Sequence, residues 1–190
     1  YFKKNDDYFG IAIDFWKMDV DGSENIKETP YLGIGRRHAS EHWTALLSAH
    51  VWIQGWVASY YLTGYHRGLD IARLSANSYL KRMWGDHGIT GRRLYLSVWN
   101  LVETYDATKD SRYLKELEER VDMMLNLQNG PDQYGSFTID RYGYSNPYVS
   151  HGLYKYHQLT NDKRVRNGLI KHARAVRDNP PYNHEYESLL

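Results

Sequence analysis

Histidine, arginine and tyrosine gather in three glycine-containing stretches of this 190-residue sequence, at 33–43, 84–93 and 134–148. Each stretch combines guanidinium or imidazole groups with aromatic side chains, and His50 and His151 follow the first and the last. A neutral imidazole or an ionised phenol can accept a proton, and a guanidinium binds a carboxylate through two parallel hydrogen bonds. These stretches therefore favour proton abstraction beside a carboxylate on the substrate.

Such a reaction, β-elimination on a uronic-acid-containing glycan, needs a base, an acid and a cation that stabilises the enolate-like state. The expected partner is a polysaccharide or oligosaccharide, with no cofactor, and a structural Ca²⁺ is left open. The catalytic candidates are the bases His42 and His87, the acids Tyr144 and Tyr142, and the neighbouring His50 and Asp86.

The aromatic composition suits a saccharide as the substrate, with 18 Tyr and 6 Trp against 4 Phe. Tyr and Trp have a flat apolar face and a polar handle, which match the C–H faces and hydroxyl rim of a sugar. The same rings could instead pack helices together. The substrate-binding candidates, chosen as carboxylate holders, stacking platforms or their neighbours, are Arg36, Arg37, His38, Trp43, Trp84, Arg92, Arg93, Asp140, Arg141, Tyr148 and His151.

Other reaction types have weaker signals. A glycoside hydrolase needs two carboxylates, for which Glu41, Asp86 and Asp140 are candidates, and this alternative stays open. The absence of cysteine excludes thiolate catalysis, and neither an HExxH motif nor a Gly-x-Ser-x-Gly elbow is present. A catalytic transition metal is therefore disfavoured. The non-enzymatic alternative is a helical-repeat module that mediates interactions or binds glycans without catalysis.

Periodic apolar residues predict six helices, at about 41–63, 67–83, 93–105, 111–127, 148–159 and 163–177. The sequence repeats where the first helix of each pair ends. Thr63, Thr108 and Thr160 follow aromatic-rich helix ends, are 45 and 52 positions apart, and precede a short link and a basic residue. This period predicts one helical hairpin per repeat.

The first helix of each hairpin is the more apolar and aromatic, whereas the second is amphipathic. We therefore expect a mainly α fold in which 36–190 forms three hairpins of an incomplete α/α toroid, with an open solenoid as the alternative. First helices would be inner, and the three chemical stretches would meet at their N-terminal ends. Residues 1–35, with a strand predicted at 10–16, are expected to be the β-rich end of a preceding domain or a linker.

Charge is nearly balanced, with 24 basic and 23 acidic residues, which disfavours nucleic acid and membrane surfaces as partners. No apolar run is long enough for a transmembrane helix. Because the chain starts at Tyr1, we expect a piece of a larger protein, with its remaining domains as partners. The localisation is left open, with an extracellular or periplasmic protein favoured.

The run GRRHASEHW at 35–43, followed by SAHVW at 48–52 and YYLTG at 60–64, resembles the toroid part of exo-rhamnogalacturonan lyase-like proteins. The resemblance is most specific over 33–72, since YYLTG is shared by many toroid glycosidases and lyases. It implies a multidomain enzyme with β-rich domains beside the toroid. It also implies β-elimination on a uronic-acid-containing polysaccharide, with a His or Tyr base.

Overall fold

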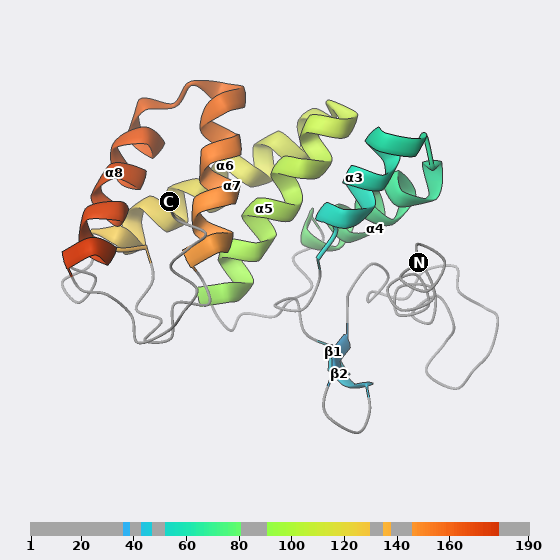
Figure 1. Cartoon of the computed structure of the whole chain (residues 1–190), viewed down its shortest axis with the longest axis horizontal. Coiled ribbons are helices and arrows are strands. Elements are labelled where there is room, and N and C mark those ends of the chain that lie inside the picture. The colour runs from blue at the N-terminus through green and yellow to red at the C-terminus, as the bar shows by residue number, and fades with distance from the viewer. Residues whose placement is uncertain are drawn as a thin grey trace. The chain divides into compact units, whose positions relative to one another are not determined.

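The computed structural model describes residues 36–38, 43–46, 52–80, 91–129, 135–137 and 146–178. The chain divides into two compact units, Tyr1–Gly88 and Ile89–Leu190. Six helices account for most of the described residues, which confirms the prediction of a mainly α protein. Figure 1 shows these helices as antiparallel hairpins that follow one another along the chain.

The first unit contains two short antiparallel strands, β1 (Arg36–His38) and β2 (Trp43–Leu46), with an irregular register between Arg37 and His38. The prediction that a helix begins near residue 41 is wrong, because β2 occupies that place and the helix begins at Gln54. The apolar run before residue 54 fits a helical period, but a short apolar run is equally compatible with a strand. The predicted strand at 10–16 lies outside the described residues.

The helices of the first unit are α3 (Gln54–Thr63) and α4 (His66–Leu80). Trp56 of α3 packs against Ile71 and Leu74 of α4. Gly68 lets the two backbones approach, because a Cβ at this position would lie 2.4 Å from the carbonyl oxygen of Trp56. A glycine thus sets the distance between the helices of this hairpin.

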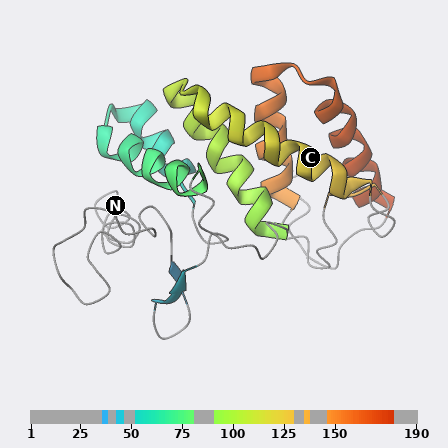
Figure 2. The same cartoon turned by 180° about the vertical axis from the view of Figure 1, so that it is seen from behind.

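The second unit holds α5 (Gly91–Thr108), α6 (Ser111–Gln128), α7 (Asn146–Thr160) and α8 (Lys163–Asp178). Their bounds lie within three residues of those predicted. Helix α5 packs against both α6 and α7, and α6 packs against α8. The first helices, α5 and α7, therefore form one layer and the second helices, α6 and α8, form another. Figure 2 shows α6 crossing in front of the first layer.

The threonines predicted to repeat end three helices in the same way. Each hydroxyl donates to the carbonyl oxygen four residues earlier, at 2.6, 2.7 and 2.8 Å for Thr63, Thr108 and Thr160. The backbone N–H two residues later donates to the same hydroxyl, at 3.2 to 3.3 Å. The repeat seen in the sequence is therefore a repeat of one hydrogen-bonding pattern.

The residue after each threonine adopts a left-handed backbone, with φ of 72° at Gly64, 56° at Lys109 and 55° at Asn161. Its N–H donates to the carbonyl oxygen four residues earlier, at 2.7 to 2.8 Å, and so closes the helix. The predicted C-cap at Gly64 is confirmed. Lys109 tolerates this conformation at a steric cost that glycine does not have.

An aspartate and an arginine open the next helix in the two hairpins of the second unit. Asp110 accepts a hydrogen bond from the backbone N–H of Arg112 and pairs with its guanidinium at 2.6 Å. Asp162 and Arg164 repeat this arrangement, with an ion pair of 2.8 Å. In these two hairpins, the basic residue predicted at the helix start therefore binds the carboxylate that caps the helix.

One ion pair is buried between α5 and α6. Arg120, which is 1 % exposed, pairs with Glu116 at 2.7 Å and donates to the hydroxyl of Ser97 at 2.8 Å. These contacts join the two layers through charged groups inside the core. The pair has hydrogen-bonding partners on both helices, as a buried pair must have to offset its desolvation.

A buried histidine supports the short segment 135–137. The backbone N–H of Phe137 donates to Nδ1 of His172 at 3.2 Å, so the proton of the neutral ring lies on Nε2. Within the described part of the chain, Nε2 has no hydrogen-bond partner. Burial lowers the pKa of His172 to about 4.

Candidate functional site

One row of side chains on α5, a helix of the first layer, is only partly buried. Most residues between Leu94 and Thr104 are buried, but Arg92, Trp99, Glu103 and Asp106 are partly exposed. Their spacings of seven, four and three place them on a single helical face. This stripe is the polar and aromatic surface that α5 presents beside α7.

Three rings form a cluster where α7 meets this stripe. The Trp99 indole stacks on the His151 imidazole at 5.2 Å between centroids and 25° between planes. Tyr148 lies 6.1 Å from the same indole. Gly152 permits this approach, because a Cβ there would lie 3.1 to 3.2 Å from Trp99 backbone and Cβ atoms. The indole Nε1 donates to Glu103 at 3.2 Å, which fixes the ring.

Charged groups continue the stripe toward the C-terminal ends of both helices. Lys155 of α7 bridges Glu103 at 2.5 Å and Asp106 at 3.1 Å, and Lys109 also binds Asp106 at 2.7 Å. Partial burial opposes ionisation of Asp106, but hydrogen bonds from Lys109 and Lys155 prevail and lower its pKa. Burial likewise opposes the charge of Lys155, yet Glu103 and Asp106 raise its pKa. Asp106 and Lys155 are therefore held in their charged forms.

Two predicted substrate-binding residues, Tyr148 and His151, meet at the Trp99 ring. Arg92 lies on the same stripe, toward the N-terminal end of α5, while Arg93 is one residue further round the helix and exposed. Figure 1 shows the first turns of α5 and α7 at the same end of the unit. The structure thus brings residues from the second and third predicted stretches to one face.

The other candidates cannot be placed as side chains. Arg36, Arg37, His38 and Trp43 are described through their strand backbones alone. The remaining predicted residues lie outside the described part of the chain, namely His42, His50, Trp84, Asp86, His87, Asp140, Arg141, Tyr142 and Tyr144. The base and acid assignments therefore stay predictions.

Five residues of this face were not predicted as site residues: Trp99, Glu103, Asp106, Lys109 and Lys155. Trp99 fits the apolar pattern of the helix predicted at 93–105, and Glu103 follows it one helical turn later. Lys155 likewise follows His151 by one turn. A spacing of one helical turn indicates that two side chains lie on the same face of a helix. The contact between α5 and α7, however, cannot be inferred from the sequence of either helix alone.

Metal ligands do not cluster on the described helices, where no three His, Asp or Glu side chains are placed to hold an ion. None of the described helices is both long and apolar enough to cross a membrane. Comparison with known proteins finds no matching family model, no matching curated protein and no matching solved structure.

Proposed function

We propose that this chain is part of an α/α-toroid enzyme that cleaves a uronic-acid-containing polysaccharide by β-elimination. The repeated threonine turn and the two-layered second unit support the toroid, because such a barrel is built from hairpins whose first helices share a layer. The first layer would line the inside of the barrel. Its partly exposed stripe would then face the substrate.

The observation that carries the proposal is the ring cluster of Trp99, Tyr148 and His151 on that layer. A sugar ring can lie against the apolar surface of such a cluster, while the polar groups of Tyr148 and His151 remain able to bind its hydroxyls. Arg92 lies on the same stripe of α5, about two helical turns before Trp99. A uronate is the sugar whose carboxylate a guanidinium would bind.

Elimination suits this face better than hydrolysis. A hydrolase needs one carboxylic acid that keeps its proton near neutral pH. Asp106 has the opposite property, because Lys109 and Lys155 lower its pKa, and Glu103 is ion-paired with Lys155. Neither carboxylate of this face therefore suits the role of a hydrolase acid.

The proposal retains the roles predicted from the sequence. His42 or His87 would be the base, Tyr144 or Tyr142 the acid, and Arg36, Arg37 and Arg92 the groups that hold carboxylates. Trp43, Trp84 and Tyr148 would serve as stacking platforms. No cofactor takes part in this reaction.

A panel of uronate polysaccharides tests the reaction type. Elimination leaves a conjugated C=C at the new non-reducing end, so each new reducing end should be matched by a rise in ultraviolet absorbance. New reducing ends without a rise in ultraviolet absorbance would show that the protein hydrolyses the glycan and does not cleave it by elimination. A protein that cleaves no polysaccharide of the panel would leave a non-catalytic module as the better account.

A further inference from the structure

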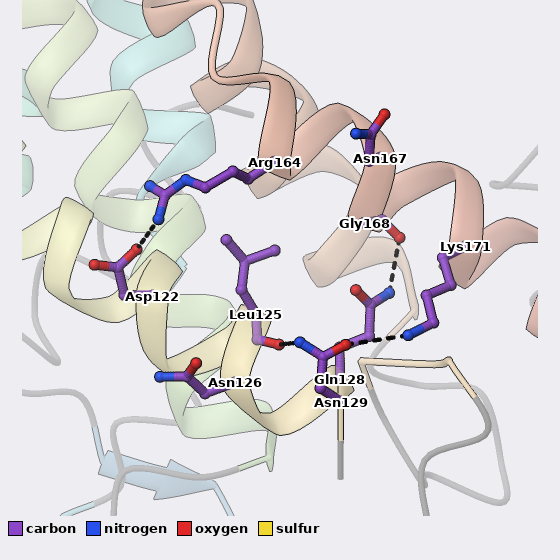
Figure 3. A pocket seen from close by; sticks show the side chains of 9 residues that line it. All are labelled: Asp122, Leu125, Asn126, Gln128, Asn129, Arg164, Asn167, Gly168 and Lys171. Carbon is purple, nitrogen blue, oxygen red and sulfur yellow. Dashed lines mark hydrogen bonds and ion pairs between the residues drawn. The ribbon is translucent and has the colours of Figure 1, made fainter.

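A polar groove lies between α6 and α8, on the second layer of the second unit. It encloses about 520 Å³, within the range of small-molecule sites. Figure 3 shows its two rims, with Asp122 and Asn126 on α6 and Arg164 and Asn167 on α8. The stacking face described above belongs to the other layer, so this groove is a separate feature.

Two polar links between the helices close the ends of the groove. Arg164 pairs with Asp122 at 2.9 Å at one end, and Lys171 donates to the side-chain oxygen of Asn129 at 3.1 Å at the other. Both links join α6 to α8, and the groove lies between them.

The floor carries a fixed acceptor. Gln128 is 3 % exposed, and its Nε2 donates to the carbonyl oxygens of Gly135 at 2.7 Å and Gly168 at 2.8 Å. Its Oε1 accepts no hydrogen bond from the described residues, and Figure 3 shows this oxygen on the side of Leu125. An oriented acceptor thus lies beside a small apolar surface.

The rims carry two carboxamides with unused hydrogen-bonding capacity. The Asn126 and Asn167 side chains are exposed and make no hydrogen bond with the described residues. Each amide can both donate and accept. A sugar hydroxyl also does both, so a hydroxyl-rich ring matches these groups better than a purely donating or purely accepting ligand.

Charge differs between the two ends. Arg164 is neutralised by Asp122 and Asp162. Lys171 has a neutral amide as its partner, and among the described residues it pairs with no carboxylate. Its stem rests on Gly135, where a Cβ would lie 3.0 Å from Cγ of the lysine. The Lys171 end therefore offers a positioned cation for one negative group.

We propose that this groove is a second, non-catalytic site that binds an acidic sugar unit of a glycan. The carboxylate would take the Lys171 end, and the hydroxyls would bind Asn126, Asn167 and the Gln128 oxygen. This ligand class comes from the groove itself, although it agrees with the substrate class of the proposed function. Such a site would hold the polysaccharide while another part of the protein acts on it.

Calorimetric titration of the full chain tests the groove, with a uronic acid trisaccharide and its carboxyl-reduced counterpart as probes. Lys171→Met should weaken binding of the acidic probe by roughly three- to tenfold and leave the reduced probe unchanged. Asn167→Ala should weaken both. Arg174→Met is the matched control, because this exposed cation of α8 lies outside the groove.

Two results would overturn the inference. The first is that the protein binds the two probes equally well, or binds neither of them. The second is that Lys171→Met and Asn167→Ala both bind the probes as the parent protein does. If Trp99→Ala removes all binding while the groove variants remain normal, the groove fails and the proposed function stands. If groove binding persists in a protein that cleaves no glycan, the proposed function fails and the groove stands.

Discussion

At the residue scale, His172 couples the stability of the second unit to pH. Its ring accepts a hydrogen bond from Phe137 through Nδ1 and is buried in its neutral form. Burial lowers its pKa from 6.5 to about 4. The unfolded chain therefore binds a proton at this residue that the folded protein does not bind between these pH values.

Stability from His172 should be fully present above pH 6.5 and should be lost as the pH falls toward 4. The full effect is about 3 kcal/mol. His172→Asn keeps an acceptor near Nδ1 but does not titrate, so urea unfolding of this variant should lose part of the pH dependence between 6.5 and 4. An identical pH dependence in both proteins would contradict the neutral, buried histidine.

At the element scale, the hairpin turns were predictable and the first helix start was not. A threonine followed by a left-handed residue is local chemistry, which the sequence at 63, 108 and 160 displays directly. The strand at Trp43–Leu46 depends on pairing with Arg36–His38, which helical periodicity does not reveal. For the same reason, the Trp99 cluster depends on contact between α5 and α7.

The turn at Lys109 should be strained. Lys109→Gly relieves the positive φ of 56° but removes an ion pair with Asp106, whereas Lys109→Ala removes the ion pair and keeps the strain. The Gly variant should therefore be more stable than the Ala variant by about 1 kcal/mol. Thermal unfolding of the two variants, side by side, measures the difference. Equal melting temperatures would argue against a left-handed Lys109.

Two glycines in helices should respond oppositely to alanine. Gly152→Ala should destabilise the second unit by about 1 to 3 kcal/mol, since its Cβ would press on Trp99. Gly55→Ala is the matched control, because nothing lies within 4 Å of its added Cβ and alanine favours a helix by about 1 kcal/mol. Denaturant unfolding should show a loss for the first and a gain for the second. A stabilised Gly152→Ala protein would contradict the close contact of α5 and α7.

At the scale of the whole molecule, two surfaces of the second unit lie on different layers. The first layer carries stacked rings and charged groups, to which we assign the proposed reaction, and the second layer carries a polar groove, to which we assign the proposed glycan binding. In the second unit, the contrast between apolar and amphipathic helices predicts which helices share a layer. It does not predict the groove, because Gln128, Asn167 and Lys171 come together only when α6 and α8 pack.

The most direct test of the stacking face compares kcat/KM on a uronate polysaccharide for Trp99→Ala, Trp99→Phe and Met123→Ala. Met123 is an exposed residue of α6 on the second layer and serves as the control. Loss of the indole should lower kcat/KM about tenfold, phenylalanine should restore part of it, and Met123→Ala should match the parent. A folded Trp99→Ala protein with unchanged kcat/KM would contradict the assignment of this face to the substrate.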